Sequence, residues 1–158
     1  MEKTNVMRIL DQKKVKYIPH CIGDNNTLSG KDVAEALQKD PTSVFKTLVT
    51  VGKSGSNYVF VVPISGELNL KKAAKAVGEK SIEMIKSKEL LPLTGYIHGG
   101  CSPIGMKKFF TTTIDISAQD KEVICFSAGK IGYQVELSPA DLGKVIRFKF
   151  ADIAEHGA

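Results

Sequence analysis

TGYIHGGCSPIGMKK, residues 94–108, is the stretch around which the rest of the chain is organised. It combines four glycines and a proline with apolar residues, such as Tyr96 and Ile104, that would tie it to a core. Glycine permits positive φ and a close approach of the backbone to a ligand, and proline restricts the backbone on both sides of its own nitrogen. The composition predicts a rigid loop whose N–H groups form a cradle for an oxyanion, a carbonyl or a phosphate. An ordinary tight turn is the alternative, and Lys107 and Lys108 favour the cradle because they add positive charge beside it.

The size and composition of the chain are those of a globular protein. It has 158 residues, of which 42% are hydrophobic and 25% are charged, and this length predicts one domain. No apolar run approaches the roughly 18–20 residues that span a bilayer. The polar start, Met1 to Asn5, leads into a helical pattern. We therefore expect no secretory signal, no membrane span and a cytoplasmic location.

Charge and cysteine spacing limit the classes of partner and cofactor. A net charge of +5 is compatible with a polyanion such as RNA, although the lack of tryptophan argues against a stacking platform for bases. Cys21, Cys101 and Cys125 are widely spaced and predict neither a disulfide framework nor a zinc site. The sequence contains no P-loop, dinucleotide-binding or zinc motif, so we expect no metal and no cofactor.

Periodicity, caps and turn residues predict a series of mixed helices and strands. The expected helices cover residues 3–14, 29–37, 70–77, 87–91 and 139–145, and the expected strands cover residues 15–22, 44–51, 58–63, 82–84, 109–116, 122–127, 133–137 and 148–153. Pro19 indicates an edge strand, and Asn69 and Gly78 are expected to cap the third helix. Because strands and helices do not alternate regularly, we predict a mixed sheet of α/β (α+β) class in one compact domain, residues 1–158.

Lys46 is the unusual residue of the first strong strand. It lies between Phe45 and the apolar-rich run Thr47-Leu48-Val49. A lysine that faces outward on alternate register would explain it. The functional alternative is a lysine that points into a lined cavity, where its ammonium would meet a phosphate, a carbonyl or a substrate sulfur.

The other polar candidates have less local support. His20, His98 and His156 do not have the spacing of a metal site, and Ser102 and Ser127 lack the G-x-S-x-G turn of a serine hydrolase.

Cys101 is a candidate nucleophile because it lies in the glycine loop. Its activation would need a nearby base or cation, and in the sequence only His98 and Lys107 are close. Cys21 and Cys125 lie in apolar strands and are interpreted as packing residues.

Four motifs occur in one order along the chain: Phe45-Lys46-Thr47-Leu48, Leu70-Lys71-Lys72-Ala73-Ala74-Lys75, Thr94-Gly95-Tyr96 with Gly99-Gly100-Cys101-Ser102-Pro103-Ile104-Gly105, and Ser127-Ala128-Gly129-Lys130. Together they resemble the YbaK/EbsC family of aminoacyl-tRNA deacylases, which is related to the editing domain of bacterial prolyl-tRNA synthetases. The similarity covers nearly the whole chain, and the lysine strand followed by the G-G-x-S-P-x-G loop is its specific part.

The resemblance implies a barrel-like mixed α/β fold with a pocket between the lysine strand and the glycine loop. It also implies hydrolysis of mischarged tRNA without a metal, typically of cysteine carried on tRNA(Pro). The lysine equivalent to Lys46 would be the key residue, and Gly99 to Pro103 would hold the ester carbonyl and the terminal ribose. In the cysteine-specific branch the thiol of the substrate would itself attack the ester carbonyl. Aminoacyl-tRNA is then the expected partner, tRNA(Pro) above all, with a prolyl-tRNA synthetase left open as a second partner.

The site residues expected on these grounds fall into three groups. The catalytic candidates are Lys46, Gly100 and Cys101. The substrate-binding candidates are His20, Thr47, Gly99, Ser102, Pro103, Ser127 and Gly129. The candidates for contact with tRNA phosphates are Lys71, Lys72, Lys107 and Lys108.

The chain also departs from the family pattern. Cys101 stands where a branched aliphatic residue is expected, Ala128 and Ile131 replace a glycine and a basic residue, and the segment Pro19-His20-Cys21-Ile22 lacks a tyrosine that is expected there. These differences bear on the preferred amino acid more than on the reaction, because small apolar changes alter discrimination by only about 1–3 kcal/mol. Two alternatives stay open: a non-catalytic module that binds tRNA or a nucleotide in the same pocket, and a hydrolase that depends on Cys101.

Overall fold

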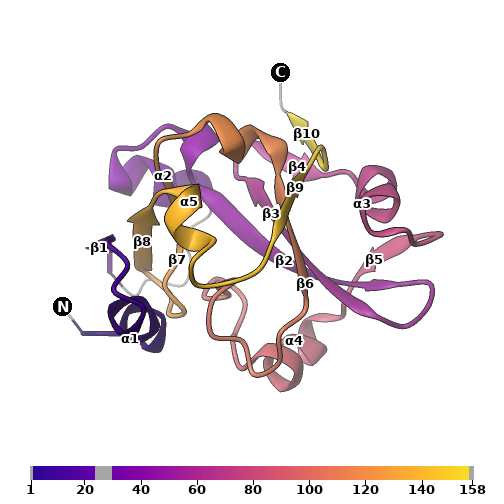
Figure 1. Ribbon diagram of the computed structural model, residues 1–158, viewed down its shortest axis with the longest axis horizontal. Coiled ribbons are helices and arrows are strands. Elements are labelled where there is room, and N and C mark those ends of the chain that lie inside the picture. Colours follow the sequence, from indigo (N-terminus) through magenta and orange to yellow (C-terminus); the bar gives the residue numbers. More distant parts are fainter. Residues whose placement is uncertain (1, 24–29, 157–158) are drawn as a thin grey trace.

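The computed structural model describes residues 2–23 and 30–156 (Figure 1). The α-helices are α1 (Asn5–Gln12), α2 (Gly30–Leu37), α3 (Leu70–Val77), α4 (Ser87–Thr94) and α5 (Pro139–Leu142), with 3₁₀ turns η1 (Pro41–Ser43) and η2 (Ile116–Asp120). The strands are β1 (Ile18–Cys21), β2 (Phe45–Gly52), β3 (Asn57–Pro63), β4 (Gly66–Leu68), β5 (Ile82–Met84), β6 (Thr111–Asp115), β7 (Ile124–Ser127), β8 (Tyr133–Leu137), β9 (Lys149–Ala151) and β10 (Ala154–His156).

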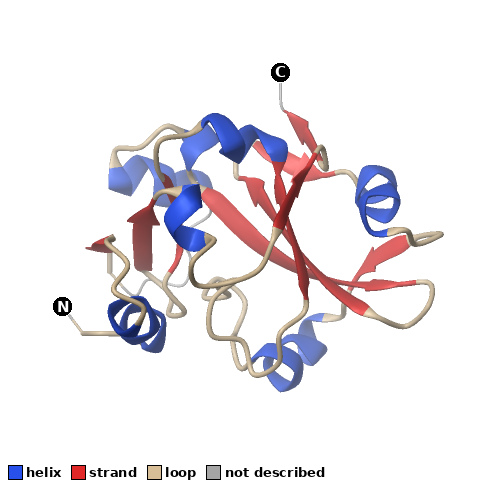
Figure 2. Ribbon diagram, viewed as in Figure 1, coloured by secondary structure: helices blue, strands red, loops and turns tan. Residues whose placement is uncertain are grey.

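The strands form a mixed five-stranded sheet and two smaller antiparallel sheets (Figure 2). The large sheet has the order β5-β2-β3-β6-β9. In it β2 pairs antiparallel with β3 and β5, while β3–β6 and β6–β9 are parallel. One small sheet has the order β1-β8-β7, and β4 pairs with β10 in the other. The predicted mixed α/β architecture is confirmed, but the strands do not close into a barrel.

The two faces of the large sheet bury different sets of side chains. Val49, Val59 and Val61 belong to the larger cluster, which also contains side chains of α1, β7 and β8. Phe60 and Val62 belong to a second cluster with Ala73 and Ala74 of α3. Side chains of a strand alternate between its faces, so β3 is covered on both sides, as its apolar sequence predicted.

Capping residues define the helix ends where the sequence predicted them. The Thr4 side chain accepts a hydrogen bond from the Met7 N–H at the start of α1, and the Asn69 side chain accepts one from the Lys72 N–H at the start of α3. Gly78 ends α3 in the left-handed conformation with φ of +74°. These local signals act within a few residues and need no tertiary context.

Several predicted boundaries were wrong where tertiary contacts decide them. The first strand covers only Ile18–Cys21, and α4 continues through Pro92 to Thr94. The α5 helix ends at Leu142, and the short strands β4 and β10 were not predicted. The predicted start of α2 at Ser29 lies outside the described residues. The edge position of β1, expected from its proline, is confirmed, since among the described strands β1 pairs with β8 alone.

Candidate active site

Lys46 lies near the start of β2, opposite Val62 of β3. Its side chain is 31% exposed, and its ammonium donates a hydrogen bond to the Glu67 carboxylate of β4 over 3.1 Å. Thr47 points to the other face of the sheet, since neighbouring side chains of a strand alternate. Lys46 is therefore neither surrounded by solvent nor enclosed in the core, and it is held by an acidic partner that the sequence analysis missed.

Strand β7 begins beside the start of β2. Val44 and Cys125 form an isolated parallel bridge, and both belong to a small cluster under α2. Two residues further along each strand, Lys46 and Ser127 lie on this same face, because a period of two returns the side chain to one side. The bridge thus places the start of β2, which carries Lys46, beside β7, which ends at Ser127.

The glycine loop contacts the turn that follows β7. Its base is closed by a hydrogen bond from the Lys107 N–H to the Thr94 carbonyl over 3.0 Å. Gly99 has φ of +88°, and a Cβ on Gly100 would lie 3.3 Å from the Ile131 nitrogen. The backbone conformation favours glycine at the first position, and the close approach of another chain segment leaves little room for a Cβ at the second.

A hydrogen bond and close packing also hold the turn after β7 in place. The Ser127 hydroxyl accepts a hydrogen bond from the Gly129 N–H over 3.1 Å. A Cβ on Gly129 would lie 3.0 Å from the Tyr96 ring and 3.2 Å from Val6. Because Tyr96 belongs to the glycine loop and also donates a hydrogen bond to the Ile104 carbonyl, the turn and the loop hold each other in place. Segment 127–131 therefore contacts the glycine loop and continues from β7, which lies beside the start of β2.

Two loop amides are available to a ligand. Ser102 is wholly buried and Cys101 is 9% exposed, and the Ser102 hydroxyl accepts a hydrogen bond from the Ile104 N–H. In the described part of the chain, the N–H groups of Cys101 and Ser102 meet no hydrogen-bond acceptor. Buried N–H groups are nearly always paired, so this arrangement suits the predicted cradle for an oxyanion or carbonyl. Pro103 follows directly and is also buried.

The Cys101 thiol is poorly placed to act as a nucleophile. Burial raises its pKa to about 12, so the thiol is neutral at pH 7. Burial, and then the nearby Cys101, raise the pKa of Tyr96 to about 12 as well. Thiolates, not thiols, are nucleophiles, and the structure therefore disfavours the hydrolase that depends on Cys101.

A charged cluster surrounds Glu136 of β8. Of its residues, sequence reasoning named only His20. The Glu136 carboxylate, whose side chain is 8% exposed, lies 2.9 Å from His20 Nε2 and accepts a hydrogen bond from the Lys39 ammonium over 3.1 Å. Burial raises the pKa of Glu136, but the hydrogen bonds from His20 and Lys39 outweigh it, and the pKa lies below its ordinary value. Glu136 is thus a carboxylate that joins β1 and α2 to β8.

Gln134 is a second residue that sequence reasoning missed. It is 7% exposed and lies opposite both Ser127 and His20 in the sheet. Its side-chain oxygen is buried and has no hydrogen-bond partner among the described residues. The signal was present in the alternation Y-Q-V-E-L of residues 133–137, where two polar side chains share one face of a buried strand.

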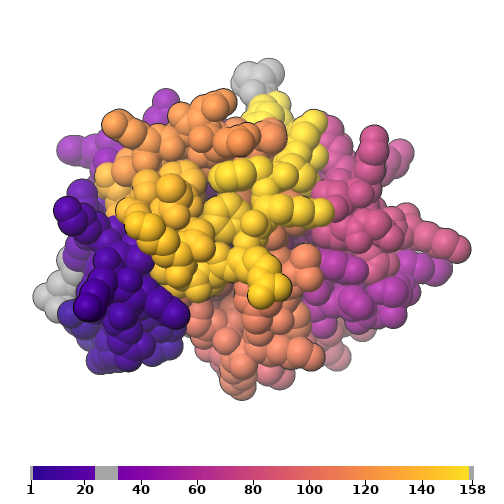
Figure 3. Space-filling view, in the orientation of Figure 1, coloured from indigo at the N-terminus to yellow at the C-terminus, as the bar shows by residue number. Residues whose placement is uncertain are grey.

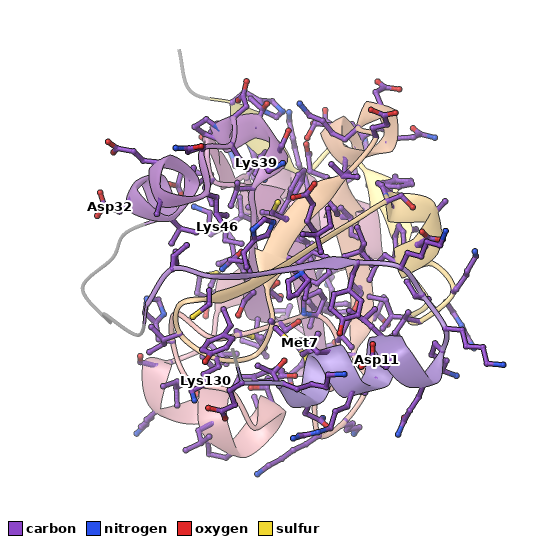
Figure 4. All side chains as sticks on the ribbon, turned by 90° about the vertical axis from the view of Figure 1, so that its left-hand side faces the viewer. Met7, Asp11, Asp32, Lys39, Lys46 and Lys130 are labelled. Carbon is purple, nitrogen blue, oxygen red and sulfur yellow. The ribbon has the colours of Figure 1, made fainter. Side chains whose placement is uncertain are left out.

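The predicted tRNA-binding lysines do not form one patch. Lys107 and Lys108 are exposed beyond the glycine loop, whereas Lys71 and Lys72 lie on α3, which packs against the opposite face of the large sheet. Lys72 is engaged by Asp152 over 3.1 Å. In Figure 4 Lys39 and Lys46 lie on the side that carries α2, with Lys130 below them.

Two surface hollows lie away from Lys46. One, of about 460 Å³, is lined by residues of η2 and the α5–β9 segment, whose surface is yellow in Figure 3. The other, of about 370 Å³, lies between the β2–β3 loop and residues 108–111. Within residues 2–23 and 30–156, no group of three His, Cys, Asp or Glu side chains could hold a metal ion. In the same ranges no helix is long and apolar enough to cross a membrane.

Comparison with known proteins gives a consistent set of relatives. The aminoacyl-tRNA editing domain family matches residues 24–145. An Enterococcus faecalis protein with the provisional name Cys-tRNA(Pro)/Cys-tRNA(Cys) deacylase EbsC is 46% identical over 153 residues, which are 96% of this chain and 93% of that protein. A proline–tRNA ligase of Shouchella clausii is 29% identical over 119 residues, which are 75% of this chain and 21% of the ligase.

The fold also matches a crystal structure provisionally described as a trans-editing enzyme for prolyl tRNA synthetase. The TM-score is 0.81 at 24% identity, and the match covers 95% of this chain and 94% of the other. At this identity the likeness concerns the fold alone.

Proposed function

The chain belongs to the aminoacyl-tRNA editing domain family, and on that premise we propose that it is a trans-editing deacylase that hydrolyses mischarged tRNA. Cys-tRNA(Pro) is the substrate we favour, since the relative that shares 46% of its residues is named for Cys-tRNA(Pro) and Cys-tRNA(Cys). The observation that carries the proposal is that β7 lies beside the start of β2, which carries Lys46, while the turn after β7 contacts the glycine loop. We further propose that residues 1–158 act as one editing domain in the cytoplasm, where charged tRNA is used.

The proposed reaction begins with the ester carbonyl in the glycine loop. The N–H groups of Cys101 and Ser102 would donate to the carbonyl oxygen as it gains negative charge. Each well-placed donor of this kind lowers the barrier by about 2.7–4 kcal/mol. His20, Thr47, Gly99, Gly100 and Pro103 are proposed to shape the surroundings of the acyl group and the terminal ribose.

The attacking group in the proposed reaction is the substrate thiol. Its sulfur forms a bond to the ester carbon, the bond from that carbon to the ribose oxygen breaks, and the thiol proton passes to the ribose oxygen. Water then hydrolyses the resulting thiolactone. Clamping the two groups of one molecule together exploits proximity, so the protein needs no nucleophile of its own. Lys46 would hold the substrate in this geometry and favour the thiolate.

The test is release of cysteine from Cys-tRNA(Pro) by the purified protein, followed with labelled amino acid. Lys46→Ala is expected to lower kcat/KM roughly 100-fold or more, because the substrate loses its charged contact. Lys53→Ala is the matched control: Lys53 is exposed in the loop after β2, and its loss changes the net charge equally. Full activity in Lys46→Ala would refute the assigned role of Lys46.

The same assay separates the alternative function. A non-catalytic binding module would bind the tRNA in a salt-dependent way and release no amino acid. A panel of tRNAs charged with cysteine, alanine, serine and proline then identifies the preferred acyl group. Adding prolyl-tRNA synthetase to the panel tests whether that enzyme is a partner.

A further inference from the structure

Glu67 is the residue that holds the Lys46 ammonium. Among the described residues it is the one hydrogen-bond partner of that group, at 3.1 Å. Glu67 itself is 77% exposed, so its carboxylate could have turned toward water. Lysine has a flexible four-carbon stem whose ordering costs conformational entropy, and a fixed acceptor at its tip limits the positions that the ammonium samples.

The position of Glu67 is set by the C-terminal strand. Strand β4 pairs with β10, and Glu67 lies opposite Glu155 in that register. The start of β10 is anchored by Asp115, which is wholly buried and accepts hydrogen bonds from the Ile153 and Ala154 N–H groups, each over 3.1 Å. A chain of contacts therefore runs from the core of the large sheet through β10 and β4 to Lys46.

We propose that Glu67 is a positioning residue for the deacylation, which aligns the Lys46 ammonium with the acyl end of the substrate. The inference rests on the proposed function, and it adds that β4 and β10 belong to the functional unit. The ammonium has three hydrogens, and the contact with Glu67 uses one of them. The others remain for the substrate, so the ion pair orients Lys46 without blocking it.

The direction of the change in kcat distinguishes a positioning role of Glu67 from a general electrostatic effect of its charge. The substrate is a polyanion, so removing a negative charge beside Lys46 should tighten binding through general electrostatics. A positioning role predicts the opposite change in the chemical step, because a loosely held ammonium meets the acyl group less often in the reactive geometry. Glu67→Ala should therefore lower kcat while KM stays constant or falls.

The kinetic experiment compares Glu67→Ala with Glu155→Ala on Cys-tRNA(Pro). Glu155 is exposed and lies directly opposite Glu67. Among the described residues its carboxylate accepts a hydrogen bond from the Asn69 side chain and none from Lys46, so its removal makes the same charge change in the same ribbon. We expect kcat to fall about tenfold in Glu67→Ala and to stay within twofold of wild type in Glu155→Ala. Equal kcat in the two variants, or a change in KM alone, would overturn the proposal. Thermal unfolding of both variants checks that they are folded.

A second measurement, by NMR, does not depend on the enzymatic activity of the protein. Reductive methylation of the lysines with ¹³C-formaldehyde gives one NMR signal for each dimethylated ammonium, and the Lys46 signal is the one missing from Lys46→Ala. We expect it to shift in Glu67→Ala and to stay in place in Glu155→Ala. An unmoved Lys46 signal would show that the contact does not hold this side chain. If the wild-type protein releases no amino acid while the Lys46 signal shifts as expected in Glu67→Ala, the result would count against the proposed function and not against the contact.

Discussion

At the scale of single residues, Cys101 shows how burial changes the role of a reactive group. Its place in the glycine loop made it a candidate nucleophile, yet its side chain lies in the larger hydrophobic cluster. Burial raises the pKa of the thiol to about 12, and no cation among the described residues offsets that rise. The useful groups at this position are in the backbone, whose N–H faces no acceptor in the described part of the chain.

Cys101→Ser should therefore remain active. A serine keeps the backbone N–H and a similar volume, so we expect kcat within about threefold of wild type. In parallel, a thiol reagent at pH 8 should modify Cys21, which is exposed, much faster than the buried Cys101 and Cys125. Loss of activity by a hundredfold or more in Cys101→Ser would revive the thiol mechanism. Lys46→Ala, measured in the same assay, shows how far activity falls when a functional residue is removed.

At the scale of elements, Glu136 joins side chains from three segments of the chain. It is on β8, His20 is on β1, and Lys39 follows α2. Since β1 pairs with β8 alone and its side chains are mostly exposed, the charged cluster supplies part of its attachment. The elements that enclose this side of the site therefore depend on one ionised carboxylate.

Glu136→Gln should make this dependence measurable. At pH 7 we expect the free energy of unfolding to fall by about 1.5–3 kcal/mol, the range for hydrogen bonds to charged groups. The Glu136 pKa is lowered in the folded protein, so its stabilisation is complete above the ordinary value near 4.5 and is lost as pH falls through the lower, folded value.

Urea unfolding of wild type and Glu136→Gln between pH 7 and pH 3 gives the test. The difference between the two proteins should be largest near neutral pH and shrink below pH 4.5. A constant difference over the whole range would mean that the charge of Glu136 is not involved. Glu83→Gln, on the exposed side of β5, controls for the general effect of removing a carboxylate.

At the scale of the whole molecule, the positive charge is spread over opposite faces. Lys71 is exposed on α3, while Lys107 and Lys108 are exposed beyond the glycine loop. With a net charge of +5, we expect contacts with tRNA phosphates to be independent of base sequence.

KM for Cys-tRNA(Pro) should accordingly rise with salt, whereas kcat should hardly change because the chemical step is within the bound substrate. If three or four phosphates are neutralised, log KM should rise with log salt concentration with a slope of about 3. Lys107→Ala should reduce that slope by about 1. Kinetics between 50 and 200 mM KCl provide the measurement, and a KM independent of salt would rule out this mode of binding.

The sequence predicted those features that depend on neighbours along the chain. The α3 helix with its two caps, the two strong strands that correspond to β2 and β3, and the mixed α/β class were all confirmed. The family resemblance read from the lysine strand and the glycine loop was also confirmed. These features are local because caps, turns and periodicity act within a few residues.

Tertiary structure alone decided which partners meet. The Lys46–Glu67 ion pair, the Val44–Cys125 bridge and the packing of Gly100 on Ile131 join segments that the chain keeps apart. No local pattern specifies such pairs, because they depend on which strand edges and loops the buried core brings together. By itself the amino-acid sequence determined the family and most of the elements, but not the short strands β4 and β10. The folded chain determined that Lys46 has an acidic partner, and that the Cys101 thiol is buried while its amide is left unpaired.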